Sequence, residues 1–172
     1  GTIRELLGEF ELARKNYQHS IDILNSLTSA DRSSSETQGA LAENHRRIAR
    51  TWLQLGHPTE AEKASTIAIQ IMETQFEEHP EDHAIEFGLA KMLADRAQQR
   101  LLLKTYAGVY PDITRSITIA EGLLEKDPAE RESIRERLGA CYYTAGCLFR
   151  DTKRLAESMD YFARSIAIRR ER

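Results

Sequence analysis

Hydrophobic positions recur every three to four residues along nearly the whole chain, which is the period of helices with one buried face. No segment alternates hydrophobic and polar residues as a half-buried strand does. The pattern therefore predicts an all-α fold with about seven main helices, preceded by a short helical stub over Ile3–Leu7. The main helices are expected over residues 9–27, 37–55, 58–78, 82–106, 111–126, 129–151 and 153–171.

Turn-forming residues support these boundaries. Gly56 suits the left-handed backbone conformation that ends many helices, and Pro58 suits the first turn of the next helix. Asp127, followed by Pro128, is expected to cap the helix that follows it. The polar stretch 28–37, which contains three consecutive serines, is predicted to be a surface loop.

One spacing occurs four times: a turn residue is followed after five, nine and twelve residues by residues that are mostly small or aliphatic. The four sets are Gly8, Ala13, Tyr17 and Ser20; Gly56, Ala61, Ser65 and Ala68; Gly108, Ile113, Ile117 and Ala120; and Lys153, Ser158, Phe162 and Ser165. Their turn residues are 48, 52 and 45 positions apart. Such self-similarity indicates a repeat protein, in which each pair of antiparallel helices buries its apolar face against neighbouring pairs. We expect a single repeat domain over residues 1–172, with units at about 1–27, 36–78, 82–126 and 129–171.

Two segments resemble the tetratricopeptide repeat. One runs from Leu41 through Trp52 to Ala68, and the other runs from Leu138 through Gly146, Phe149 and Phe162 to Ser165. The resemblance implies a right-handed superhelical solenoid of antiparallel helix pairs, which acts as a protein–protein interaction scaffold. Residues 148–172 also resemble helical repeats that lie C-terminal to bacterial serine/threonine protein kinases, which implies a signalling role. In residues 84–124 the match is loose, because Arg96 and Arg100 occupy positions where the family has apolar residues.

The resemblance also implies that the first helix of each pair lines a concave groove. The residues it places in this groove are Arg46, Arg50, Leu53, Tyr143, Cys147 and Arg150. Residues 36–55, 84–104 and 131–150, which cover most of the three predicted first helices, carry a summed formal charge of +5 in a chain whose net charge is −3. Because arginine pairs bidentately with carboxylates and phosphates, we expect an acidic or phosphorylated peptide as ligand. The alternative is that these arginines only balance local acids on solvated surfaces.

Charge, apolar runs and cysteines restrict the environment and the partners. A net charge of −3 argues against a nucleic-acid binder. No apolar run approaches the roughly 20 residues of a membrane-spanning helix, so no membrane contact is expected from this segment. The chain begins Gly-Thr, and we expect it to belong to a longer protein that can be membrane-anchored elsewhere. Cys141 and Cys147, six residues apart on one helix, cannot bridge, and unpaired thiols fit the cytoplasm.

Candidate chemistry is sparse, and we expect no enzyme activity, no cofactor and no metal. His79 and His83 have a spacing that suits metal binding on a helix, but Pro80 places His79 before the helix begins. His45 is expected to be a packing residue. The sequence contains no Gly-x-Ser-x-Gly elbow, no phosphate-binding glycine loop and no kinase signature. The alternative to a peptide-binding scaffold is a structural or dimerisation module of a larger signalling protein, which an exposed patch at residues 101–103 or at the N-terminal end would favour.

Overall fold

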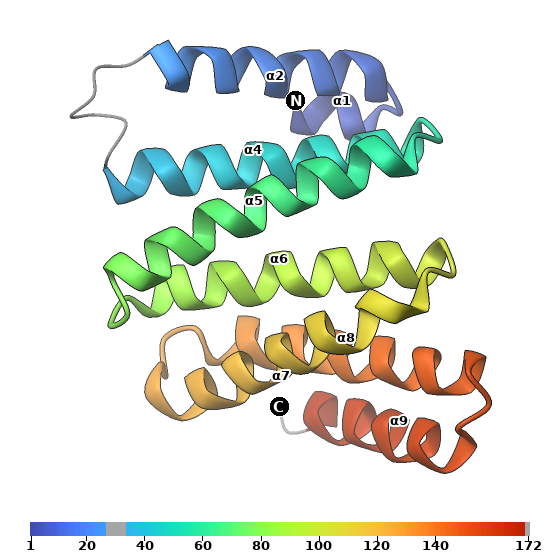
Figure 1. Ribbon diagram of the computed structural model, residues 1–172. Coiled ribbons are helices and arrows are strands. Elements are labelled where there is room, and N and C mark those ends of the chain that lie inside the picture. Colours follow the sequence, from blue (N-terminus) through green and yellow to red (C-terminus); the bar gives the residue numbers. More distant parts are fainter. Residues whose placement is uncertain (27–33, 171–172) are drawn as a thin grey trace. The chain divides into compact units, whose positions relative to one another are not determined.

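The computed structural model describes residues 1–26 and 34–170, and all regular structure in these ranges is helical (Figure 1). The elements are α1 (Thr2–Leu6), α2 (Phe10–Ser26), α4 (Ser35–Gln54), α5 (Pro58–Glu78), α6 (His83–Leu102), the 3-10 helix η1 (Tyr106–Gly108), α7 (Val109–Lys126), α8 (Arg131–Asp151) and α9 (Leu155–Arg170). Within the described ranges, the prediction of an all-α chain with seven long helices and a short initial one is confirmed. Residues 28–33 of the predicted loop lie outside those ranges.

The chain divides into two compact units. The N-terminal unit is Gly1–Ile85 and the C-terminal unit is Glu86–Arg172. Consecutive helices pack within each of them: α4 lies against both α2 and α5 in the first, and α8 lies against both α7 and α9 in the second. Each unit therefore holds two helix pairs of the repeat.

The largest difference from the expected boundaries follows α6. The helix predicted to continue to residue 106 ends at Leu102, because Lys104 adopts a left-handed backbone conformation with φ 58°. Gly108, assigned from the sequence as the turn residue of the third set, has a right-handed φ of −92°. It lies at the end of η1, directly before α7 begins. The turn of the third repeat is thus at Lys104, four residues earlier than expected.

Four residues with positive φ now mark the repeat: Gly8, Gly56, Lys104 and Lys153. At each one, the amide of the turn residue donates to the carbonyl three residues earlier, at 3.0–3.1 Å. The next amide donates to the carbonyl five residues before it, at 2.8–2.9 Å. This is the Schellman motif, which satisfies carbonyls at a helix C-terminus. The turn residues are 48, 48 and 49 positions apart, so the repeat is more regular than the sequence suggested.

The corrected register places buried residues at matching positions in all four repeats. Five residues after the turn lie Ala13, Ala61, Val109 and Ser158, all buried. The third set is therefore Val109, Ile113 and Ser116 rather than Ile113, Ile117 and Ala120. Its turn was misplaced because the left-handed conformation is signalled in sequence by glycine, and here lysine adopts it.

Small residues let the paired helices approach closely. In the last pair, the Ser158 hydroxyl donates to the Gly146 carbonyl at 2.8 Å, and the Ser165 hydroxyl donates to the Gly139 carbonyl at 2.7 Å. A Cβ atom on Gly146 would lie 2.6 Å from the Phe162 ring, so glycine is required for this contact. In the third pair, the hydroxyl of Ser116, at the position matching Ser165, donates to the backbone of α6. These bonds satisfy buried hydroxyl groups.

Aromatic residues contribute to the cores of both units. Phe149 and Tyr142 are buried, and Trp52 packs against the core of the N-terminal unit. His45 is half-buried, and its burial lowers the pKa of its imidazole. The three consecutive leucines differ in burial. Leu101 packs against the core of the C-terminal unit, whereas Leu102 and Leu103 are exposed.

Replacing Lys153 with glycine is expected to stabilise the chain by about 0.5–1 kcal/mol, because glycine adopts positive φ without a Cβ clash. The greater entropy of glycine in the unfolded chain offsets part of this gain. Urea unfolding followed by circular dichroism measures the change. Gly56→Lys is the reciprocal control and should lower stability; a loss of stability in both variants would contradict the assigned turn.

Candidate functional site

The groove residues predicted on α4 are engaged within the protein. Arg46 donates to both carboxylate oxygens of Glu43, from Nε at 2.7 Å and from Nη2 at 2.8 Å. Arg47 donates from Nε to the same carboxylate at 2.7 Å. Burial acts to raise the pKa of Glu43, but hydrogen bonds and positive charge from both arginines outweigh it and lower the pKa. A single carboxylate thus balances two guanidinium groups.

Arg50, one turn further along α4, pairs with α1. One of its NH2 nitrogens lies 2.8 Å from Oε2 of Glu5, whose side chain is almost fully buried. Leu53 is half-buried in the next turn. Both arginines predicted to bind ligand from α4 therefore have carboxylate partners inside the N-terminal unit.

The three residues predicted on α8 differ in accessibility. Tyr143 is 53% exposed, with its ring centre 5.6 Å from that of Phe162. Cys147 is only 7% exposed. Arg150 is exposed and pairs with the neighbouring Asp151 at 2.9 Å. Tyr143 and Arg150 can contact a partner from the surface of α8, whereas the Cys147 thiol is covered.

Arg96 and Arg100, which made the sequence match of the third repeat loose, form a buried ion-pair cluster. Arg96 approaches both carboxylate oxygens of Asp112 at 2.8 Å, and Arg100 NH1 lies 2.8 Å from one of them. Arg100 also donates to the Gly108 carbonyl at 3.1 Å. These side chains point from α6 to α7 and take the place of the apolar contacts of the other repeats. Their charge is therefore structural and adds nothing to a ligand surface.

A hollow of about 510 Å³ lies between α6 and α8, the first helices of consecutive repeats in the C-terminal unit. It is lined by Phe87, Lys91, Glu130, Ser133, Glu136, Arg137 and Ala140. We call it the α6–α8 hollow. None of the six residues predicted from the sequence lines it.

The α6–α8 hollow brings together two cations from facing helices. The Lys91 ammonium nitrogen lies 5.9 Å from the centre of the Phe87 ring, within cation–π range. Across the hollow, Arg137 NH1 donates to Asp95 Oδ1 at 3.1 Å, and both side chains are about three-quarters buried. Carboxylates at Glu130 and Glu136 border the same space. The lining therefore places two cations and two carboxylates beside one aromatic ring.

With the turn at Lys104, the sequence shows that α6 and α8 contribute equivalent positions to the hollow. Lys91 lies thirteen residues before the turn residue Lys104, and Ala140 lies thirteen residues before Lys153. Equivalent positions of two repeats therefore meet in one hollow. With the turn assigned to Gly108, this equivalence was hidden.

The histidines and cysteines considered in the sequence analysis form no metal site or disulfide in the described residues. His79 directly follows the last residue of α5 and His83 begins α6, so the two imidazoles do not share a helix face. In the part of the chain that the structure describes, no three histidine, cysteine, aspartate or glutamate side chains are grouped to hold a metal ion. Cys141 and Cys147 are buried free thiols, as expected. Over residues 1–26 and 34–170, no helix combines the length and apolar character needed to cross a membrane.

Comparison with known proteins adds no assignment. No protein-family model matches the chain. No curated protein matches it either.

Proposed function

We propose that the chain is a non-catalytic protein-binding module that holds an acidic or phosphorylated segment of a partner in the α6–α8 hollow. The observation that carries this proposal is the position of two cations, Lys91 and Arg137, which come from consecutive first helices and border one space beside the Phe87 ring. Arg137 is held in this position by its bond to Asp95. A carboxylate or phosphate placed there gains charge-assisted hydrogen bonds. Rigid helices on both sides reduce the ordering cost of binding.

The same proposal includes a tetratricopeptide-like solenoid. It is supported by the 48–49-residue spacing of the Schellman turns and by the buried residues five positions after each turn. In such a solenoid the first helices share one surface, which is where the α6–α8 hollow lies. The buried free thiols at Cys141 and Cys147 favour a reducing compartment such as the cytoplasm.

Charge reversal in the hollow should weaken an acidic peptide by about tenfold or more for each residue, because an attractive pair becomes repulsive. The probe is a set of fluorescein-labelled peptides that carry aspartate, glutamate or phosphoserine beside a leucine. Fluorescence anisotropy measures their affinities for the unaltered chain, Lys91→Glu and Arg137→Glu. Lys126→Glu, an exposed charge reversal on α7 outside the lining, is the matched control.

Two results would count against this site. One is that none of the acidic peptides binds the unaltered chain. The other is that Lys126→Glu weakens binding as much as Lys91→Glu. An affinity lost with rising salt but insensitive to all three variants would place the peptide elsewhere on the surface.

A second candidate function is dimerisation within a larger signalling protein. It is favoured by exposed apolar side chains on and after α1, where Ile3, Leu6 and Leu7 are 74%, 84% and 69% exposed. Solvent-exposed groups of this kind are typical of interaction surfaces. Sedimentation velocity over a range of concentrations separates the two functions, since a tight dimer that binds no acidic peptide supports the second.

A further inference from the structure

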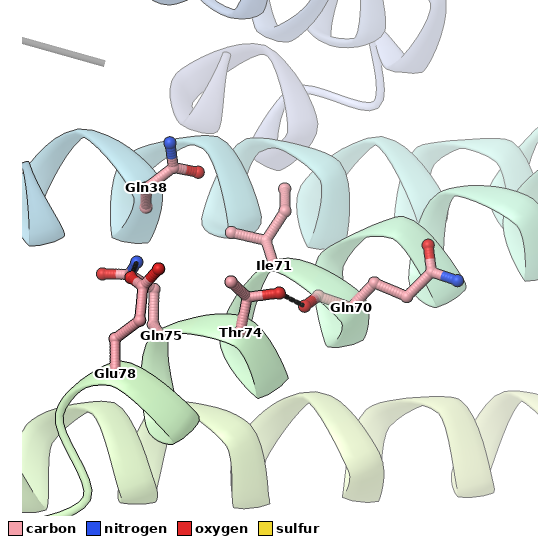
Figure 2. Close-up of a pocket in the computed structure, with 6 residues that line it drawn as sticks. All are labelled: Gln38, Gln70, Ile71, Thr74, Gln75 and Glu78. Atoms are coloured by element: carbon pink, nitrogen blue, oxygen red, sulfur yellow. Dashed lines mark hydrogen bonds between the residues drawn. The ribbon is translucent and has the colours of Figure 1, made fainter. Parts of the chain in front are cut away.

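A separate hollow of about 360 Å³ lies between α4 and α5 in the N-terminal unit (Figure 2). It is lined by Gln38 of α4 and by Gln70, Ile71, Thr74, Gln75 and Glu78 of α5. These six side chains include three amides, a hydroxyl and a carboxylate, but no cation and no aromatic ring. Its lining thus carries negative charge alone, whereas the lining of the α6–α8 hollow carries both signs.

Gln75 has a buried acceptor without a donor. Its side chain is 4% exposed, and its Nε2 donates to Glu78 Oε2 at 2.9 Å. Its Oε1 atom has no hydrogen-bond partner. Exchanging the two ends of the amide would place Oε1 against the Glu78 carboxylate, so the bond to Glu78 fixes the orientation. Because buried polar groups are almost always paired, this oxygen is expected to accept a hydrogen bond from water or from a ligand.

Two further oxygens in the hollow can accept hydrogen bonds. Glu78 is exposed and supplies a negative charge beside Gln75, as Figure 2 shows. The Thr74 hydroxyl donates its proton to the Gln70 backbone carbonyl at 3.1 Å, which leaves its lone pairs to accept (Figure 2). Ile71 supplies the aliphatic part of the lining. A ligand that donates hydrogen bonds, carries positive charge and has an alkyl portion is therefore suited to the part of the hollow that Ile71, Thr74, Gln75 and Glu78 line.

We propose that this hollow binds a primary ammonium group on an alkyl chain, either a lysine side chain of a partner protein or a free alkylamine. The ammonium group has three N–H donors, which match in number the acceptors of Gln75, Glu78 and Thr74. One N–H group satisfies Gln75 Oε1 while the charge pairs with Glu78, and the methylene groups contact Ile71. The volume lies in the range of small-molecule sites. This inference does not depend on the acidic-peptide proposal, because the residues and the ligand charge are different.

The test is a titration of the isotopically labelled chain with n-butylammonium chloride, followed by NMR at the Gln75 side-chain amide and the Ile71 methyl groups. Saturable shifts at both positions are expected. Tetramethylammonium has the same charge but no N–H donor, and it should give no saturable shift. Acetyl-Gly-Lys-Gly-amide separates the two sources: tighter binding than n-butylammonium identifies a lysine side chain, and exclusion of the tripeptide identifies a free alkylamine.

Three variants locate the site. Glu78→Gln should weaken n-butylammonium at least fivefold, whereas Glu77→Gln, an exposed neighbour outside the lining, should leave it unchanged. Gln75→Met should abolish the saturable shift at Ile71 without lowering the unfolding temperature, because it replaces an amide whose buried oxygen is unpaired with an apolar chain of similar size. The proposal is overturned if n-butylammonium gives no saturable shift, if tetramethylammonium gives the same shift, or if the two glutamate variants behave alike.

Discussion

Replacing Asp112 with alanine is expected to destabilise the chain by about 3–5 kcal/mol, the usual cost of removing one partner from a buried ion pair. Asp112 is 5% exposed and is the carboxylate on which the Arg96 and Arg100 guanidinium groups converge. Its removal leaves both cations largely desolvated beside each other. Urea unfolding followed by far-ultraviolet circular dichroism measures the loss.

The control for this variant is Asp160→Ala, which removes a carboxylate from a pair with Arg164 at 3.0 Å. Both side chains of that pair are more than half exposed, so we expect a change below about 0.5 kcal/mol. A second variant, in which Arg96→Ile, Arg100→Met and Asp112→Ala are combined, should lie within about 2 kcal/mol of the unaltered chain. Apolar residues of similar volume often replace buried ion pairs without loss. If Asp112→Ala were as mild as Asp160→Ala, the cluster would not be a structural element.

Replacing Phe149 with alanine is expected to cost about 3–5 kcal/mol, as large-to-small changes of buried aromatic residues do. The ring is 3% exposed and stacks on Tyr161 with ring centres 5.3 Å apart. It also meets the edge of Tyr110 at 5.8 Å, and the Arg154 guanidinium lies 4.4 Å from its centre. Loss of the ring therefore leaves a cavity and removes contacts to α7 and α9 together.

Thermal and urea unfolding both measure this effect. Met159→Ala is the matched control, since this side chain on α9 is 73% exposed and its truncation should change stability by less than about 0.5 kcal/mol. Equal losses in the two variants would show that Phe149 is not an anchor of the C-terminal core.

Helix positions and packing residues were predictable because both depend on local spacing. The periodicity located all seven long helices, and Gly56 and Pro58 marked their junction correctly. Lys104 was missed because a lysine in the left-handed conformation has no sequence signal comparable to that of glycine. Asp127 binds the amides of Ala129 and Glu130, but it does so in a turn before α8 rather than as the residue that begins the helix.

The candidate site was less predictable, because charge counted along a helix does not reveal which partners other helices supply. Arg50 and Arg96 both count as positive charge on their own helices, but Arg50 pairs with Glu5 on α1, and Arg96 pairs with Asp112 on α7. These pairs join residues 45 and 16 positions apart in sequence. The cations that border the α6–α8 hollow, Lys91 and Arg137, come from two different helices. Only the packing of α6 beside α8 makes them neighbours.

The four identical turns have a consequence for how such a chain changes in length. Because Gly56 and Lys104 have the same backbone conformation and hydrogen bonds, removal of residues 56–103 would join α4 directly to an equivalent turn. A duplication of the same block would likewise insert one helix pair without creating a new kind of junction. Recombination at these turns therefore adds or deletes whole repeats while conserving local backbone geometry, and the chain can evolve by changing its number of repeats.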